Sequence, residues 1–289
     1  MLPIGVCSQL ACIWETTARC PGNAHRYRDF TDTSYVDFLT SAAVTAGVLD
    51  NAPGRPVGQT VLDGVRATRA VVNANTNLGV LLLLAPLASV PTGEDLRQGV
   101  ELVLDTLTLQ DSRAVYEAIR LANPAGLGEV PEQDIKEEPT ESLRRIMTLA
   151  SERDLVARQY ANGYLEVFEE GIPALRHCLT MSPFLEEAIV YCHLTLMARF
   201  PDSLIARKRG PAEAVDAARQ AQQVLDHGWP MNQAARAALS ALDGWLRGAD
   251  RGRNPGTTSD LVTASLFAAL REGIIKLPCR FSQAPGSDS

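Results

Sequence analysis

Apolar residues recur at intervals of three and four along nearly the whole chain, and this spacing is typical of amphipathic helices. Leu10, Ile13, Trp14 and Thr17 give one example, and no convincing run of the alternating strand pattern competes with it. The same period predicts helices over Tyr35–Ala46, Val57–Val72, Leu96–Leu109, Leu143–Leu155, Phe184–Met197, Ala212–Leu225 and Ala234–Leu246. Because Pro or Gly separates these segments, we expect an all-α fold.

Two further helices are predicted from their first turns. Asn73–Gly79, NANTNLG, opens the apolar run LLLLAPLA, and Thr257–Asp260 offers several capping oxygens before LVTASLFAALREG. Frequent Ala and Gly on the inward faces let helices approach closely. We expect one compact multi-helix domain over residues 1–280 with long functional loops, and a disordered tail over 281–289. Such faces are also compatible with a homodimer.

The charge balance and the apolar runs argue against several classes of protein. The 289 residues hold 27 Lys+Arg against 34 Asp+Glu, a net charge of −7 without a long basic run, which argues against nucleic-acid binding. The longest apolar stretch, Leu78–Val90, is shorter than the roughly 20 residues that span a bilayer. The N-terminus has no basic leader, and the six cysteines form no CxxC pair. These features predict a cytoplasmic protein with reduced thiols and no membrane contact.

Two polar segments interrupt the helical pattern, Arg19–Ser34 and Asn123–Thr140, and both are too long for simple connections. Guanidinium groups in the first can neutralise phosphates, and its carboxylates can hold Mg²⁺ or take a proton from a hydroxyl. A solvated loop whose charges pair with each other is the alternative. Glu15 lies one turn before Arg19, so a surface ion pair is its alternative. The charged and amide side chains around the Pro-Gly turn are Arg19, Asn23, His25, Arg26, Arg28, Asp29, Asp32 and Asp37.

Three further segments carry groups suited to a phosphorylated ligand. The asparagines and threonine of Asn73–Gly79 stand at the positive end of a predicted helix, where they can recognise phosphate, ribose or an amide. Simple N-capping needs only one of them. Asn254–Asp260 repeats this arrangement, although a cap explains most of it. In RFPDSLIARKRG, Asp202 is a candidate metal ligand and Arg207–Arg209 are candidate phosphate clamps, with a solvated basic loop as the alternative.

The usual catalytic motifs are missing from the sequence. No phosphate-loop, dinucleotide, zinc-protease or serine-hydrolase motif occurs. His193 lies in an apolar predicted helix, where a core histidine with satisfied hydrogen bonds is the common explanation. The residues favour chemistry by acids and bases carried on loops, together with Mg²⁺.

Five blocks of the chain carry a family resemblance. They are ACIWETTARCPGNAHR, NTNLGVLLLLAPLA, ARQYANGYLEVFE, HLTLMARFPDSLIARKRG and NPGTTSDLVTASLF. In this order, from Ala11 to about Gly273, the chain resembles the triphosphoribosyl-dephospho-CoA synthase family, which serves the prosthetic groups of citrate lyase and malonate decarboxylase. The resemblance implies an all-helical, Mg²⁺-dependent transferase. A hydroxyl of the acceptor, 3′-dephospho-CoA in the family, displaces adenine from C1′ of ATP and acquires a triphosphoribosyl group through an α linkage.

The resemblance also implies which residues carry the reaction, which needs a base, cations for the triphosphate and a pocket for an oxocarbenium-like ribose. The candidate catalytic residues are Glu15, Asp32 and His25, and the candidate metal ligands are Asp32 and Asp202. The candidates for binding ATP are Asn23, Arg26, Asn75, Thr76, Asn77, Gly79, Arg158, Lys208, Arg209 and Asn254. Pro21, Gly22, Gly163, Gly210, Pro255, Gly256 and Asp260 also fall on family-like positions.

The chain departs from the family pattern at several of these positions. Cys20 stands where the family usually has Lys, His25 where it has Asp, and Ser34 in place of one of two paired Asp. The family's His-Lys-Gly element reads Asn77-Leu78-Gly79. Losing these cations and carboxylates changes how a triphosphate or an acceptor is held.

Three alternatives therefore stand beside the family reaction. The first is (phospho)ribosyl transfer to a pterin acceptor in tetrahydromethanopterin biosynthesis, with ATP or phosphoribosyl pyrophosphate as donor. The second is a Mg²⁺-dependent N-glycosidic hydrolase. The third is a non-catalytic helical module that binds a nucleotide.

Overall fold

The computed structural model describes residues 2–124, 132–248 and 252–282. Within these ranges the chain forms fourteen α-helices, one short π-helix and no β-strand, which confirms the predicted all-α fold. The first eight helices are α1 (Ile4–Thr17), α2 (Tyr35–Asp50), α3 (Val57–Arg69), α4 (Leu78–Ser89), α5 (Leu96–Asp105), α6 (Leu109–Ala122), α7 (Leu143–Ala150) and α8 (Leu155–Asn162). The π-helix η1 (Val167–Gly171) is followed by α9 (Ile172–Met181), α10 (Leu185–Arg199), α11 (Ser203–Arg209), α12 (Pro211–Asp226), α13 (Gln233–Arg247) and α14 (Gly256–Arg271).

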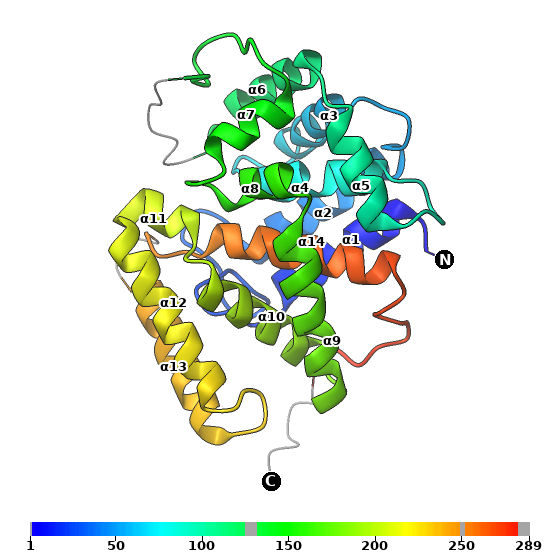
Figure 1. Cartoon of the computed structure of the whole chain (residues 1–289). Helices are drawn as coiled ribbons and strands as arrows, with labels where there is room; N and C mark the ends of the chain where they lie inside the picture. The colour runs from blue at the N-terminus through cyan, green and yellow to red at the C-terminus, as the bar shows by residue number, and fades with distance from the viewer. Residues whose placement is uncertain (1, 125–131, 249–251, 283–289) are drawn as a thin grey trace.

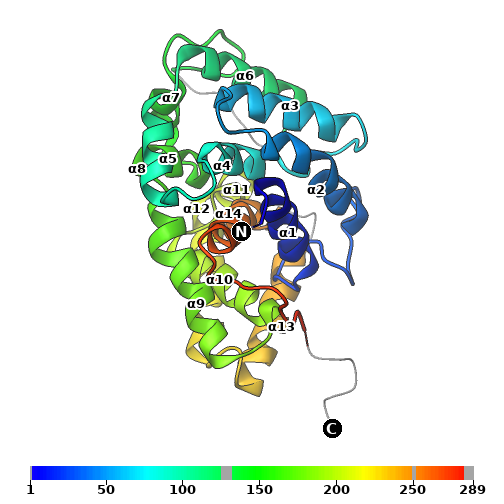
Figure 2. The same cartoon turned by 90° about the vertical axis from the view of Figure 1, so that its right-hand side faces the viewer.

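Helix α14 is the centre of the molecule. Its sequence is apolar on all sides, so it can be stable only when other helices enclose it. Every residue from Leu261 to Arg271 is buried, and the helix contacts α1, α4, α8, α9, α10 and α11. Figure 1 shows α14 crossing the middle of the fold, and Figure 2 looks along it with α1, α4 and α10 around it.

Helix α4 is a second buried helix, and it contains Pro86. A proline inside a helix has no N–H, so the carbonyl of the residue four positions earlier loses its usual donor. That carbonyl belongs to Leu82, and the Tyr160 hydroxyl donates to it at 2.6 Å. The Tyr164 hydroxyl donates to the next carbonyl, that of Leu83, at 2.8 Å. These two fully buried tyrosines therefore tie α8 and the residues after it to α4.

Several predicted helices are shorter in the structure because a capping residue begins a new helix. The predicted helix Leu143–Leu155 ends at Ala150, and Asp154 caps α8 by accepting two backbone N–H groups. The predicted helix Leu96–Leu109 ends at Asp105 because Thr108 begins α6 with a capping box. The periodicity does not predict α6, α8, α9 or α11, and α11 covers the basic cluster for which a solvated loop is the alternative interpretation.

The two long polar segments connect helices as predicted. One lies between α1 and α2, and the other lies between α6 and α7, where residues 125–131 are outside the described ranges. At the C-terminus, the Phe281 carbonyl accepts the Glu186 N–H at 2.8 Å. Residues 283–289 of the predicted tail lie outside the described ranges. No helix in the described part of the chain is long and apolar enough to cross a membrane.

One buried carboxylate, that of Asp202, caps two helices. Its Oδ1 accepts the N–H groups of Leu204 and Ile205 at the start of α11, at 2.8 and 2.9 Å. Its Oδ2 accepts the N–H and the hydroxyl of Thr258 in the first turn of α14, at 2.7 and 2.9 Å. The cap of α14 therefore comes from another helix, whereas the sequence predicts it within Thr257–Asp260. Because both oxygens are used, this geometry argues against Asp202 as a metal ligand.

We expect Asp202→Ala to lower the free energy of unfolding by about 3 kcal/mol, because four buried or half-buried donors lose their acceptor. Asp202→Asn keeps one acceptor oxygen, and we expect it to lose about half as much. Urea unfolding of the metal-free protein measures both changes. Wild-type stability in Asp202→Ala would contradict the capping role and restore the metal-ligand hypothesis.

Candidate functional site

A cavity of about 930 Å³ lies where the N-terminal ends of α4, α8 and α14 meet. Parts of α1, α2, α6, α7 and α11 and of the two polar segments complete its walls (Figure 1). The volume is in the range of small-molecule sites, roughly 300–1,000 Å³. Helix N-termini present backbone N–H groups and partial positive charge, so they favour anionic groups of a ligand.

Glu15 lies at the floor of the cavity within an amide and hydroxyl network. Its carboxylate accepts from Asn23 Nδ2 at 3.3 Å and from Thr16 Oγ1 at 3.5 Å. Asn23 also donates to Ser259 Oγ and accepts from Asn254 Nδ2 at 2.9 Å. Burial raises the pKa of Glu15 to about 7, while hydrogen bonds act in the opposite direction. A carboxylate that titrates near neutral pH is suited to act as a general base.

Two neutral groups lie on the core side of Glu15. One ligand atom each of Glu15, Cys20 and His193 lies within 4.8 Å of the other two. Burial lowers the pKa of His193 to about 3 and raises the pKa of the Cys20 thiol, so both are uncharged at pH 7. Neither His193 nitrogen has a hydrogen-bond partner among the described residues, in contrast to the satisfied core histidine expected from the sequence. Neutral neighbours leave the desolvation of Glu15 uncompensated on this side.

Asp260 is a second carboxylate of the cavity wall. It belongs to the first turns of α14 and lies against the first turn of α4, where a Cβ at Gly79 would overlap its Oδ2. Burial raises the pKa of Asp260 well above its usual range, and the nearby charges of Asp202, Glu15 and Asp154 act in the same direction. The cavity therefore holds two carboxyl groups that both favour the protonated form more than a surface carboxyl does.

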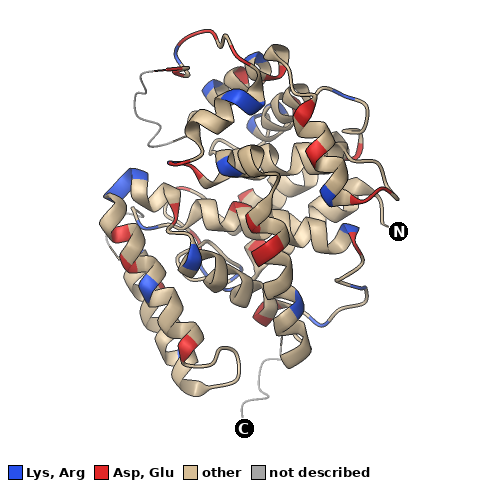
Figure 3. Ribbon diagram, in the orientation of Figure 1, with Lys and Arg blue, Asp and Glu red and all other residues tan. Residues whose placement is uncertain are grey.

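Three basic side chains of the described residues line the cavity: Arg153, Arg207 and Lys208. Arg207 forms an ion pair with Asp154, the residue that caps α8. The end of α11 is a dense basic region on the molecule's surface, as the blue ribbon in Figure 3 shows. Arg153, Arg207 and Lys208 thus lie near the N-terminal end of α8, where Asp154 accepts two backbone N–H groups and pairs with Arg207.

The Asn73–Gly79 segment forms another wall, and its side chains have different tasks. Asn75 Oδ1 accepts the Leu78 N–H at 3.2 Å and so satisfies the first turn of α4. Asn77 Nδ2 donates to Thr68 at 2.9 Å, and the Thr76 hydroxyl bonds to that of Ser41 at 2.6 Å. Helix capping thus uses one of the four polar side chains, as the sequence indicates.

One side of the cavity is apolar. It is formed by α6 and α7, which are joined by the second polar segment. Its residues are Val115, Tyr116, Ile119, Leu143, Ile146 and Met147. An apolar wall next to basic groups suits a ligand with an aromatic base and an anionic group.

The structure brings most of the predicted site residues together but leaves five aside. Those that line the cavity are Glu15, Asn23, Asp32, Asn75, Thr76, Asn77, Gly79, Lys208 and Asn254. Those that do not are His25, Arg26, Arg158, Asp202 and Arg209.

Arg158 donates to the Ser151 carbonyl at 3.1 Å, and Arg209 packs against Gly252. His25 Nδ1 accepts the Tyr27 N–H, and burial with the nearby Arg247, Arg26 and Arg19 charges lowers its pKa to about 4. This geometry does not support a catalytic role for His25.

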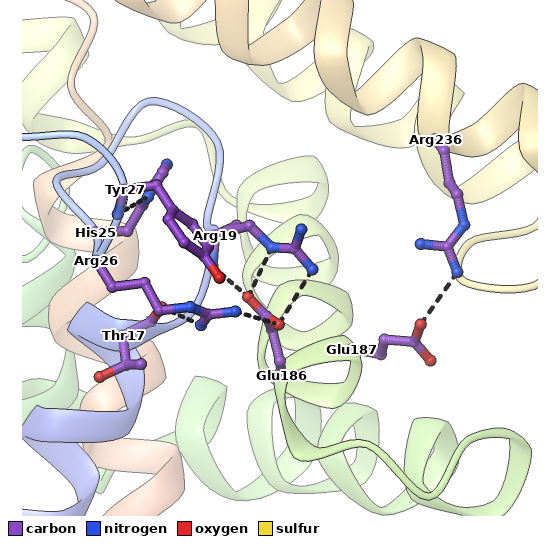
Figure 4. Close-up of polar contacts among 8 residues, drawn as sticks. All are labelled: Thr17, Arg19, His25, Arg26, Tyr27, Glu186, Glu187 and Arg236. Atoms are coloured by element: carbon purple, nitrogen blue, oxygen red, sulfur yellow. Dashed lines mark hydrogen bonds and ion pairs between the residues drawn. The ribbon is translucent and has the colours of Figure 1, made fainter. Parts of the chain in front are cut away.

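Arg26 and Arg19 hold the first polar segment on α10 through one carboxylate, that of Glu186 (Figure 4). Glu186 accepts from Arg19 Nε and from Arg26 Nη2, each at 2.9 Å. Arg26 Nη1 also donates to the Thr17 carbonyl at 2.7 Å. Burial alone would raise the pKa of Glu186, but the two guanidinium groups outweigh it and the pKa is lowered. The predicted surface ion pair between Glu15 and Arg19 is therefore wrong. Arg26 attaches the first polar segment to α10 through its ion pair with Glu186.

Sequence reasoning does not single out several charged residues that line the cavity, among them Arg153, Asp154 and Asp260. The first two stand in the SERD turn between α7 and α8, which the periodicity predicts as helix. Asp154 is a typical N-cap residue. Recognising it as the start of a helix could have placed Arg153 and Asp154 at the cavity. Asp260 falls on a family-like position, but nothing in its local sequence distinguishes it from a capping residue.

We expect Glu15→Gln to stabilise the fold at alkaline pH. The pKa of Glu15 is about 7 in the folded protein and near 4.5 in an unfolded chain, so stability falls as pH rises between these values. The neutral amide removes this loss, which amounts to as much as about 3 kcal/mol. Thermal unfolding at pH 5 and pH 8 measures the effect, with the exposed Glu152→Gln as control. An equal change at both pH values would contradict the raised pKa.

Comparisons with known proteins give one consistent result. A family model described as CitG, ATP:dephospho-CoA triphosphoribosyl transferase, matches residues 2–278. A Vibrio cholerae serotype O1 (strain M66-2) protein, named as a 2-(5''-triphosphoribosyl)-3'-dephosphocoenzyme-A synthase, is 34% identical over 105 residues. That alignment covers 36% of this chain and 33% of the relative, so the chain matches about a third of the relative's length. An Archaeoglobus fulgidus crystal structure, named as a triphosphoribosyl-dephospho-CoA synthase, is similar with a TM-score of 0.64 and 29% identity, over 81% of this chain and 99% of that one.

Proposed function

The chain belongs to the ATP:dephospho-CoA triphosphoribosyl transferase family, and we propose that it transfers the triphosphoribosyl group of ATP to an acceptor hydroxyl with release of adenine. The observation that carries this proposal is the cavity itself. It combines a buried carboxylate that titrates near neutral pH, a basic side beside a helix N-terminus, and an apolar wall. These are the three features that such a transfer needs.

The reaction is a displacement at C1′ of the donor ribose. The acceptor oxygen forms a bond to C1′, the bond from C1′ to N9 of adenine breaks, and the electron pair of that bond leaves with the purine. A single displacement inverts the β configuration of ATP and so gives the α linkage of the family. Glu15 takes the proton of the acceptor hydroxyl as the new bond forms.

The charge distribution supports one orientation of the donor. The triphosphate lies at the basic side, near Arg153, Arg207 and Lys208 and the N-terminal end of α8. The adenine lies against the apolar wall of α6 and α7, which is next to α8 along the chain. The acceptor then approaches from the side of α1, α2 and the first polar segment, where Glu15 and Asn23 stand.

Mg²⁺ belongs to the proposal as the counter-ion of the triphosphate. Asp32 lines the cavity and is exposed, with Oδ1 accepting from Thr33 Oγ1 at 3.2 Å. Mg²⁺ keeps several waters and often binds through one or two carboxylates plus substrate phosphates, so Asp32 fits such an ion. Asp202 does not fit, because its oxygens already accept four hydrogen bonds. When bound, the ion neutralises part of the triphosphate charge.

The acceptor is 3′-dephospho-CoA in the family, and a pterin precursor of tetrahydromethanopterin is the second candidate. The observation that favours a different acceptor is the position of the family departures. Asn77 and Leu78, which replace two family residues, both line the cavity. Replacing a cation there favours a less anionic acceptor. The homodimer stays a prediction that analytical ultracentrifugation tests.

The first test measures adenine release from ATP with Mg²⁺ in the presence of 3′-dephospho-CoA, a dephosphorylated pterin precursor or no acceptor. We expect release with one acceptor only, together with a product heavier by the triphosphoribosyl group. The rate should rise with pH through about 7, as Glu15 loses its proton. Release without acceptor would indicate a hydrolase, and ATP binding without turnover would indicate a binding module.

A second test concerns the donor's phosphates. We expect Lys208→Gln to raise the KM for ATP about tenfold with little change in kcat, because it removes a cation that acts equally before and during the displacement. Arg209→Gln, at the neighbouring position outside the cavity lining, is the matched control and should change KM by less than about twofold. Steady-state kinetics at two salt concentrations measure both. A larger effect at Arg209 would contradict this placement of the triphosphate.

A further inference from the structure

Three buried side chains meet at Glu15, and the proposed function uses only Glu15 itself. Glu15, Cys20 and His193 each offer one ligand atom, and these three atoms lie within 4.8 Å of one another. Cys20 and His193 are fully buried, and neither lines the cavity. A carboxylate oxygen, a cysteine sulfur and an imidazole nitrogen are the three kinds of side-chain atom that bind Zn²⁺ in proteins.

His193 is the residue of this cluster that points to a ligand. It lies on α10 without exposed surface, and neither of its ring nitrogens has a hydrogen-bond partner among the described residues. Buried polar side chains almost always have such a partner, because leaving them without one costs stability. Burial lowers the pKa of His193 to about 3, so the neutral ring keeps a nitrogen lone pair at pH 7. An ion bound to this nitrogen removes part of the cost.

Cys20 is held beside α10 by its neighbour in the chain. The Arg19 guanidinium and backbone N–H both donate to Glu186 of α10, at 2.9 and 3.2 Å (Figure 4). Glu186 and His193 are seven residues apart, so they lie two turns apart on one face of α10. The Cys20 N–H donates to the Ala18 carbonyl at 2.8 Å. Contacts that involve no ion therefore bring the thiol and the imidazole together.

The Glu15 carboxylate has room for an ion, whereas that of Asp202 does not. Glu15 accepts from Asn23 at 3.3 Å and from Thr16 at 3.5 Å. Two carboxylate oxygens offer about four acceptor positions, so lone pairs of Glu15 remain unused. Asp202 already accepts four hydrogen bonds. An ion at Glu15 is thus compatible with the hydrogen bonds of its carboxylate.

The donor atoms and their charges favour zinc. Mg²⁺ prefers oxygen ligands, whereas one sulfur, one nitrogen and one oxygen suit Zn²⁺. A thiolate and a carboxylate together carry two negative charges, which the ion neutralises in this buried place. Zinc bonds of roughly 2.0–2.3 Å in a tetrahedron put ligand atoms about 3.3–3.8 Å apart. Side-chain movements of about 1 Å close the observed spacing to that range.

We propose that Glu15, Cys20 and His193 bind one zinc ion, and that bound zinc withdraws Glu15 from the acceptor hydroxyl. The second part rests on the proposed function. The ion enters through the cavity, because Glu15 lines it and the other two ligands lie on its core side. On binding, the Cys20 S–H bond breaks, the sulfur keeps the electron pair and shares it with zinc, and the proton leaves to solvent. A cavity water completes the tetrahedron.

Bound zinc acts on the proposed reaction through the base. A carboxylate that holds zinc accepts the proton of the acceptor hydroxyl much less readily, so transfer slows. The zinc ligands come from α1, the first polar segment and α10, whereas the cations near the proposed triphosphate position come from the turn before α8 and from α11. Zinc therefore lowers kcat and leaves the KM for ATP nearly unchanged.

Metal titration of the full wild-type chain tests the site without any measure of activity. We expect chelator-treated protein to take up one Zn²⁺ per chain from a chromogenic chelator, with release of protons. Co²⁺ in place of Zn²⁺ should give the intense absorption band of a thiolate bound to cobalt. Neither measurement depends on the folding of a variant. No uptake at micromolar zinc, or a cobalt complex without the thiolate band, would overturn the site.

Variants identify the ligands. We expect Cys20→Ser and His193→Gln each to weaken zinc binding at least about tenfold, because each removes one bond to the ion. Cys279→Ser and His227→Gln, both at exposed positions, are the matched controls and should bind zinc as the wild type does. Wild-type zinc affinity in Cys20→Ser or His193→Gln would contradict the ligand assignment.

Adenine release with ATP, Mg²⁺ and the acceptor tests the effect of zinc on the reaction. Zinc at about ten times its Kd should lower the wild-type kcat at least about fivefold, and a zinc-selective chelator should restore it. The same zinc concentration should change kcat of Cys20→Ser by less than about twofold relative to its own zinc-free rate. An unchanged kcat in zinc-saturated wild type would overturn the inhibition. If no acceptor supports adenine release by the zinc-free wild type, the proposed function fails, while the titration still decides the zinc site.

Discussion

The carboxylate of Asp202 makes the central helix of this fold possible. Helix α14 is buried from Leu261 to Arg271, and the backbone N–H groups of its first turn have no partner within the helix. Asp202 accepts one of them together with the Thr258 hydroxyl, and it begins α11 with its other oxygen. One buried charge therefore fixes the N-terminal end of α14 relative to α11. The cavity forms at this end, so its position follows from the same interaction.

The cavity holds groups that a fold optimised for stability would not keep. Glu15 is desolvated, and Asp260 has no hydrogen bond within the described residues. Glu15 costs stability where it is charged, because burial has removed its solvation, and Asp260 is buried without gaining a hydrogen bond. Destabilised groups held by a rigid frame are common at active sites, where function opposes stability.

Local sequence patterns predict the fold well, but the partners of charged residues much less well. The intervals of three and four predict α2, α12 and α13 because each helix buries one face, a property of neighbouring residues alone. Arg26 and Arg158 resemble phosphate clamps in sequence, yet their partners are Glu186 and the Ser151 carbonyl. The Arg26 partner is 160 residues away, and no local pattern reveals it. Asp202 shows the same limit, because a cap and a metal ligand look alike until the distant Thr258 is placed beside it.

The departure from the family at residue 20 acquires a physical meaning in this structure. Cys20 does not line the cavity and is buried with His193 on the core side of Glu15. A Lys ammonium at this place would stabilise the Glu15 carboxylate and lower its pKa, whereas a neutral thiol leaves burial as the dominant influence. The replacement thus costs the cavity no phosphate-binding cation. In the proposed reaction it changes the strength of Glu15 as a base, and a stronger base suits an acceptor whose hydroxyl gives up its proton less readily.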